Sequence, residues 1–200
     1  MVSRFMFVIF SLMVLIITAS WAQKWGKVTE WEKQISEVPD DPEADAIILF
    51  HNGEYEITED FKFKKKIHFR AKILIKAGIE KYSDFRISYW HEDRLTKLKA
   101  QTILPGGKKI KVKKKQIFEE KDRRFRTRVF AMPAVEVGAI VEYQVEILSE
   151  YLHFFEPWYF QHEEFTASSR LSVFIPDGFN YRVLNRNFRG LPTEPIVKPT

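Results

Sequence analysis

Apolar and basic side chains alternate along sixteen residues, from Phe61 to Lys76, with few exceptions. Because successive side chains of a strand point to opposite faces, this pattern predicts one long strand with one face in a core and one in water. Such half-buried strands are typical of antiparallel sheets. At about 3.3 Å per residue the strand would span roughly 50 Å, so we expect a bulge or bend within it. The basic positions are Lys62, Lys64, Lys66, His68, Arg70, Lys72 and Lys76.

A short helix and a hairpin are expected before this strand. Thr29 and Glu32 have the spacing of a capping box, which predicts a helix that continues to about Ile35. Asn52 and Gly53 form a dipeptide typical of two-residue hairpin turns, between an apolar run at 46–50 and a return strand at 55–57. The β-rich part of the chain is therefore expected to open with a hairpin.

Strand patterns separated by turn signals continue along the rest of the chain. We interpret 119–124 as a charged loop, and we expect the acidic face of a strand at 141–147 to pair with Arg124, Arg126 and Arg128. No long segment has helical periodicity. The predicted fold is all-β and mainly antiparallel, a β-sandwich or two packed twisted sheets with a short N-terminal helix. Further strands are expected at 85–89, 98–104, 110–112, 125–131, 158–165, 171–175 and 181–183.

The first 22 residues have the composition of a secretory signal peptide. Arg4 precedes an apolar stretch, and Ser20-Trp21-Ala22 resembles a cleavage site. An uncleaved membrane anchor is the alternative, since residues 5–22 carry no charge. In either case the chain would be exported, to the periplasm, the cell envelope or the extracellular space.

The expected organisation has four parts. A signal peptide occupies 1–22, a short helix and linker follow at 23–41, and a β-domain occupies 42–190. Residues 191–200 are rich in proline and show no strand pattern, so we interpret them as a linker at which a longer protein is truncated.

The chain contains no cysteine and has a formal net charge of +5 at pH 7. The lack of cysteine excludes disulfides, thiolate metal sites and a cysteine nucleophile within these residues. The mild positive charge identifies no partner. Export makes nucleic acid an unexpected partner and favours anionic envelope polymers or lipid head groups.

Residues 130–143 combine an alanine-x-proline turn, Gly138 and the sequence Val141-Glu142-Tyr143. Together with stretches at 44–50, 100–108 and 158–161, in this order, the run resembles the bacterial Domain of Unknown Function 3857 family over about residues 42–185. The resemblance implies an exported β-rich module that commonly precedes a transglutaminase-like domain of the papain-like cysteine type. The catalytic cysteine, histidine and aspartate of such enzymes lie in that following domain, so the resemblance places no catalytic residue here.

The five histidines, His51, His68, His91, His153 and His162, are too scattered for a local metal-ligand spacing. His162-Glu163 begins like a zinc-protease motif, but the second histidine four positions later is missing. We interpret His162 as a strand-edge or loop residue and His68 as a solvated side chain. No catalytic, cofactor-binding or metal-binding residue is assigned, and a metal-dependent hydrolase using His91, His153 or His162 is kept only as a remote alternative.

Adjacent carboxylates occur at Glu119-Glu120 and Glu163-Glu164. Neighbours on a strand point to opposite faces, so we interpret both pairs as surface charge rather than as acid–base pairs. A nucleophile elbow and a phosphate-binding glycine loop are both missing from the sequence.

A basic run and an aromatic cluster are the remaining candidates for binding. The run at 108–115 would bind phosphate, anionic lipid or acidic glycan, although lysines on an edge strand also prevent unwanted strand pairing, which is the simpler interpretation. The aromatic cluster is expected to fill a core or a domain interface rather than to stack on sugars. Its members are Tyr151, Phe154, Phe155, Trp158, Tyr159, Phe160 and Phe165.

These observations favour a non-catalytic exported β-module. It would be accessory to a transglutaminase-like or cysteine-peptidase-like domain downstream in the same polypeptide, would not be an enzyme and would need no cofactor. The alternative is an independent domain that binds anionic glycan or lipid of the envelope through Lys62, Lys64, Lys66 and the run at 108–115. An envelope polymer or protein is a further possible partner, and a membrane is a partner only if the signal segment stays uncleaved.

Overall fold

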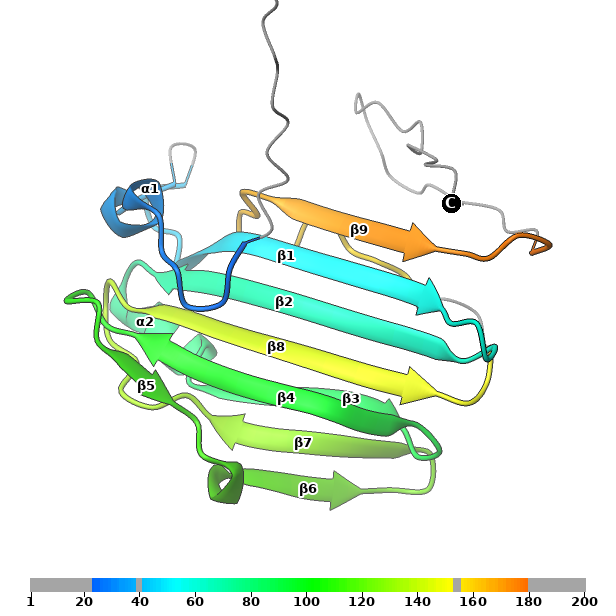
Figure 1. Cartoon of the computed structure of the whole chain (residues 1–200). Coiled ribbons are helices and arrows are strands. Elements are labelled where there is room, and N and C mark those ends of the chain that lie inside the picture. Colours follow the sequence, from blue (N-terminus) through cyan, green and yellow to red (C-terminus); the bar gives the residue numbers. More distant parts are fainter. Residues whose placement is uncertain (1–22, 39–40, 153–155, 180–200) are drawn as a thin grey trace, which may run out of the picture.

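The computed structural model describes residues 23–38, 41–152 and 156–179. These ranges contain nine strands and short helices, which Figure 1 shows. The helices are α1 Glu30–Gln34 and α2 Lys76–Lys81, with a 3-10 turn at Lys114–Gln116. The strands are β1 Ala46–Ile57, β2 Phe63–Ile73, β3 Asp84–Trp90, β4 Arg94–Ile103, β5 Lys109–Lys111, β6 Ile117–Lys121, β7 Phe125–Ala131, β8 Ile140–Ser149 and β9 Ser169–Phe174.

The strands form two sheets that pack face to face. The larger sheet has the order β5-β4-β8-β2-β1-β9 and the smaller one β3-β7-β6. Pairing is antiparallel except between β1 and β9, which are parallel. Phe69 of the larger sheet and Phe85 and Phe130 of the smaller one meet in one apolar cluster. The predicted all-β fold of two packed sheets with a short N-terminal helix is confirmed. We call the face of the larger sheet that points to the smaller sheet its inner face, and the opposite one its outer face.

The hairpin predicted at Asn52 and Gly53 is wrong, because both residues lie inside β1. Asn52 pairs with His68 and Gly53 with Ile67 on β2, and both also pair with β9 on the other side. Gly53 is required for close packing instead: a Cβ at this position would lie 2.5 Å from a ring carbon of Trp158.

β2 is shorter than the strand predicted at 61–76, and the expected irregularity lies in its partner. The register shifts between Ile48 and Phe50 of β1. After Ile73 the chain turns into α2, where Gly78 lies so close to Asp45 that a Cβ would be 2.2 Å from the Asp45 carbonyl oxygen. The sequence indicated only a break at Gly78, so α2 was not predicted.

The face of β7 that carries Arg126 and Arg128 is the one that points to the larger sheet. Phe130 is buried between the sheets, and the arginines at even positions share its face, so Thr127 and Val129 point away from the larger sheet. Arg128 forms an ion pair at 2.5 Å with Glu119, which belongs to β6 and not to the loop predicted at 119–124. The expected pairing of β8 with the arginine strand is also wrong, because β8 lies between β2 and β4.

Residues 23–38 cover one end of the outer face. α1 begins at the predicted capping box: the Glu32 N–H donates to the Thr29 hydroxyl at 3.2 Å, and the Thr29 N–H donates to the Glu32 carboxylate at 2.6 Å. Val28, Ile35 and Val38 pack with residues of β1 in a second apolar cluster. This segment therefore shields the end of the outer face that carries Arg70 and Glu142 from solvent.

Several predicted features lie outside the described residues: the segment at 1–22, the strand at 181–183 and the linker at 191–200. In the part of the chain that the structure describes, no helix is long and apolar enough to cross a membrane.

Candidate functional site

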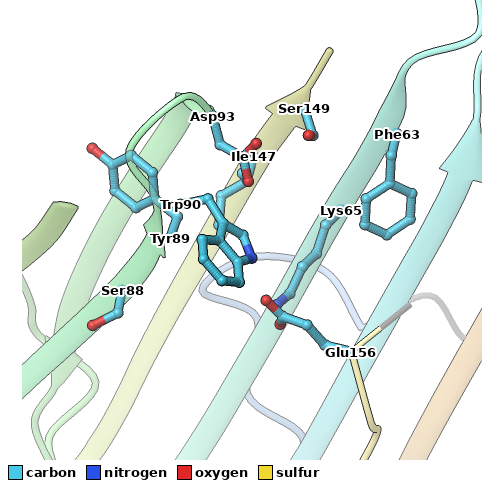
Figure 2. Close-up of a pocket in the computed structure, with 9 residues that line it drawn as sticks. All are labelled: Phe63, Lys65, Ser88, Tyr89, Trp90, Asp93, Ile147, Ser149 and Glu156. Carbon is cyan, nitrogen blue, oxygen red and sulfur yellow. The ribbon is translucent and has the colours of Figure 1, made fainter. Parts of the chain in front are cut away.

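A small pocket lies between the two sheets where β2 begins and where β3 and β8 end (Figure 2). Its volume is about 30 Å³, which is room for one or two water molecules. The pocket is therefore too small for a substrate of ordinary size. It is lined by Phe63, Lys65, Ser88, Tyr89, Trp90, Asp93, Ile147, Ser149 and Glu156.

The charged groups of this pocket have partners. Lys65 forms an ion pair with Glu156, and Figure 2 shows the ends of these two side chains meeting. Burial and the Glu156 carboxylate raise the pKa of the neighbouring Tyr55, so its phenol stays protonated. No histidine is among the described residues that line the pocket, and its lysine is ion-paired, so this lining offers no activated nucleophile.

Two histidines that are 111 positions apart meet on the inner face, next to the chain segment 156–168. His51 Nδ1 and His162 Nε2 are 2.9 Å apart, so a hydrogen bond between these two nitrogens joins the rings. Burial and the positive charges of His162 and Lys65 lower the pKa of His51 to about 4. A hydrogen bond with the Tyr159 backbone raises this pKa, but the lowering effects are larger. Burial also lowers the pKa of His162, although the charge of Glu164 opposes this. Both rings are therefore neutral at pH 7.

Trp158 attaches the segment 156–168 to β1 and β9. Its ring stacks on His51 with centroids 4.1 Å apart and planes at 24°. It also covers Gly53, and its indole N–H donates to the Ser169 hydroxyl at 3.1 Å. The strand predicted at 158–165 is wrong, since this stretch has no regular structure and only Thr166 forms an isolated bridge, to Ile48.

The other histidines do not join this pair. His68 is not solvated as predicted, because its Nε2 lies 2.7 Å from the buried Glu142 carboxylate. His91 lies in the turn after β3, where its N–H donates to the Arg124 carbonyl at 2.8 Å. His153 lies outside the described residues. Within the described ranges, no three histidine or acidic side chains are grouped in a way that would hold a metal ion.

A buried ionic network on the outer face is the largest polar feature that the sequence interpretation missed. The Arg70 guanidinium donates to Glu142 at 2.6 Å and to Glu32 at 2.8 Å. The Gln101 amide and the Gly26 N–H donate to the other oxygen of Glu142, at 2.7 and 2.9 Å. The network thus joins β2, β4 and β8 to the N-terminal segment.

Glu142 is ionised within this network. Burial opposes its ionisation, but His68, Arg70 and Gln101 outweigh burial and lower the pKa of the carboxyl. The basic face of β2 was predicted to lie in water, and at Arg70 and Lys72 this is wrong because residues 23–38 cover it. In the sequence, the only indication of this network was that Arg70 and Lys72 lie on one face of the strand. Exposure of that face to solvent accounts for the same spacing.

The lysines proposed as anion ligands fall into two groups. Those of β2 and the preceding turn have carboxylate partners, whereas the lysines of 108–115 have no ion-pair partner among the described residues. β5 is an edge strand of the larger sheet, where lysines hinder pairing with another sheet. The paired lysines are Lys62 with Asp60, Lys64 with Glu56 and Lys66 with Glu54.

Neither of the adjacent carboxylate pairs forms an acid–base site. Glu119 pairs with Arg128, whereas Glu120 pairs with Arg86. Glu163 and Glu164 both contact Lys81. These carboxylates therefore serve as ion-pair partners.

The predicted aromatic cluster is not buried as a whole. Three of its members are between 48% and 67% exposed, namely Tyr151, Tyr159 and Phe165. Trp158 is partly buried as described, and Phe154 and Phe155 lie outside the described residues. These three rings therefore lie at the surface of the domain.

Residues 59–198 match the family described as "Domain of Unknown Function with solved-structure structure (DUF3857)". The chain belongs to the DUF3857 family. In this DUF3857 chain the most distinctive motif of the sequence, Val141-Glu142-Tyr143, lies on β8. Val141 is in the core between the sheets, Tyr143 packs against that core, and Glu142 is the centre of the ionic network. Gly138, in the turn before β8, has a φ of 84°, a conformation that favours glycine.

No curated protein matches the DUF3857 chain. Its fold is similar to parts of larger solved structures. A candidate protease from Parabacteroides distasonis is 13% identical with a TM-score of 0.47, over 53% of this chain and 23% of that one. Leukotriene A4 hydrolase from Saccharomyces cerevisiae is 10% identical with a TM-score of 0.32, over 65% and 17%. An M1 zinc metallopeptidase from Deinococcus radiodurans is 8% identical with a TM-score of 0.27, over 54% and 22%. The match thus spans less than a quarter of the length of each of these proteins.

Proposed function

We propose that this DUF3857 chain is a non-catalytic, exported docking module that is accessory to a further domain of the same polypeptide. The further domain is expected to be transglutaminase-like or cysteine-peptidase-like, as the family resemblance implies. The signal-like segment at 1–22 supports export. The module would hold or cover that domain and would not carry out chemistry itself.

The observation that carries this proposal is a group of exposed apolar side chains at the free edge of β9. Val173 and Phe174 of β9 are 42% and 49% exposed and, as neighbours on a strand, flank this edge on opposite faces of the sheet. Tyr159 and Phe165 of the preceding segment are exposed too. Phe165 lies at the other end of β1, where its carbonyl accepts the Ile48 N–H at 3.0 Å, whereas Phe174 pairs with Glu56. Exposed apolar groups of this kind are typical of interaction surfaces. β9 is the last strand of the described chain and forms one edge of the larger sheet.

The polar groups of the chain support a non-catalytic role. Lys65 and Glu156 are paired with each other in the pocket, and Arg70 and Glu142 are buried under the N-terminal segment. A general base or nucleophile needs access to a substrate. Arg70 and Glu142 do not have that access, and the half-exposed Glu156 is held in its ion pair with Lys65.

The proposal is tested by expressing the region encoded after Thr200 separately and measuring its binding to this chain by calorimetry. We expect the double variant Val173→Thr and Phe174→Ser to weaken binding at least tenfold. Phe118→Ser is the matched control, because Phe118 is 66% exposed on β6 of the other sheet. Equal binding by all three proteins, or a reading frame without a further domain, would contradict the proposal.

A second candidate function is binding of anionic envelope polymers or lipids. It rests on the lysines of 108–115, which lack ion-pair partners among the described residues, whereas Lys64 and Lys66 are paired. This candidate predicts salt-sensitive retention on vesicles that contain anionic lipid. Lys109→Glu with Lys111→Glu should abolish retention, and Lys64→Gln should not change it. Equal loss in both variants would exclude a site at 108–115.

A further inference from the structure

The His51–His162 pair has the chemical character of two metal ligands. Neutral imidazole nitrogens bind Zn²⁺, Cu²⁺ and Ni²⁺, and the rings must be neutral to do so. The hydrogen bond between the rings requires a lone pair on one of the two facing nitrogens. We propose that His51 Nδ1 and His162 Nε2 bind a divalent transition metal ion, with Cu²⁺ as the best fit.

The distance between the two nitrogens fits this proposal. With bonds of about 2.0 Å, two cis ligands of a square-planar ion lie about 2.8 Å apart, and two ligands of a tetrahedral ion about 3.3 Å apart. The observed 2.9 Å lies near both values, and sites with nitrogen ligands generally bind Cu²⁺ more strongly than Ni²⁺ or Zn²⁺. On binding, the ring that donates the hydrogen bond moves its proton to its other nitrogen, and the metal takes the place of the hydrogen bond between the rings.

The surroundings hold one ligand firmly and leave the other adjustable. His51 lies on β1, stacks on Trp158 and is hydrogen-bonded to the Tyr159 backbone. Such contacts orient a metal-binding ring. His162 is exposed in a segment without regular structure, so its ring can tilt until both lone pairs meet at one point.

The local charges permit a bound cation. Glu164 acts on His162 as a negative charge, and the positive Lys65 beside His51 is paired with Glu156. Because no third histidine or acidic ligand completes the group among the described residues, water would fill the remaining positions. The site would therefore exchange its metal readily.

Trp158 provides the measurement, since a paramagnetic Cu²⁺ ion bound to His51 would lie beside the stacked indole and quench its fluorescence. CuCl₂ is titrated into the purified untagged protein. We expect saturable quenching with one ion per chain and at least tenfold weaker binding in His162→Gln. His91→Gln is the matched control and should bind as the wild type does. In Trp158→Phe most of the quenching should disappear, while calorimetry still detects the ion.

A second readout does not depend on a folded variant. The electron paramagnetic resonance spectrum of the wild-type protein with one Cu²⁺ should show nitrogen coupling from two imidazoles. Unchanged affinity in His162→Gln, quenching that does not saturate, or a spectrum without imidazole nitrogen would each overturn the proposal.

Discussion

The Arg70 guanidinium lies 2.6 Å from the Glu142 carboxylate, and both side chains are almost completely buried. Arg70 also lies over the ring of Phe50, 4.8 Å from its centroid. On the other side Glu142 accepts the N–H of Gly26, so the pair connects the centre of the larger sheet to the N-terminal segment. The stability of the domain therefore depends on a charge pair that water does not reach.

Replacing Glu142 by glutamine should destabilise the fold by about 3 kcal/mol, the lower end for breaking a buried ion pair, because Arg70 keeps Glu32 as a partner. The free energy of unfolding is measured in urea. The control is Glu54→Gln, which removes a partly exposed pair with Lys66 and should cost less than about 1 kcal/mol. Similar losses in the two variants would show that the network does not stabilise the fold.

Adding a methyl group at Gly53 should separate Trp158 from β1. The new Cβ would lie 2.5 Å from the indole, and overpacking of this kind costs about 1–3 kcal/mol. Tryptophan fluorescence and urea unfolding of Gly53→Ala measure both effects. Gly106→Ala is the control, since a Cβ added there would have no atom within 4 Å, and it should be neutral or slightly stabilising.

The two sheets should be held together mainly by the apolar cluster around Phe130. Phe130→Ala is expected to cost about 3–5 kcal/mol, because the side chain is 1% exposed and leaves a cavity. Phe118→Ala, on the same small sheet, should change stability by less than about 0.5 kcal/mol because its ring is 66% exposed. The midpoints of thermal unfolding of the two variants are compared. Equal shifts of the two midpoints would show that the cluster around Phe130 is not what mainly holds the sheets together.

Acid should destabilise the domain through His51. Its pKa falls from 6.5 in the unfolded chain to about 4 in the folded one, so the unfolded chain takes up the proton first. This contribution to stability is complete above about pH 6.5 and is lost as the pH falls towards 4.

The free energy of unfolding, measured in EDTA at pH 7 and 4.5, should therefore fall in the wild type by about 2 kcal/mol more than in His51→Gln. His91→Gln should keep the wild-type dependence. An identical pH dependence in His51→Gln would show that other groups cause the acid effect.

The fold class followed from local patterns, because period-two alternation and turn residues report directly on strands. The capping box at Thr29 and Glu32 and the strand β8 were found in this way. Asn52-Gly53 misled for a physical reason: the same dipeptide that favours a turn also leaves room for the Trp158 ring. The local sequence does not show which large side chain from a distant part of the chain will pack against a given residue.

The candidate sites could not be predicted for a similar reason. His51 and His162, or Arg70 and Glu142, become neighbours only through pairing between distant strands and segments. The face of β2 that carries Arg70 has the same alternation whether water or the N-terminal segment covers it. These contacts depend on the register between paired strands and on which segment covers each face of the sheet. The period of the apolar and polar alternation contains neither kind of information.

β9 pairs with β1 in parallel, so the last strand of the described chain covers the edge of the first strand. During synthesis β1 leaves the ribosome early, and its outer edge stays open until Ser169–Phe174 has emerged. An open edge is a template for pairing with another nascent chain. Translation that stops before this point would therefore release a polypeptide prone to aggregation.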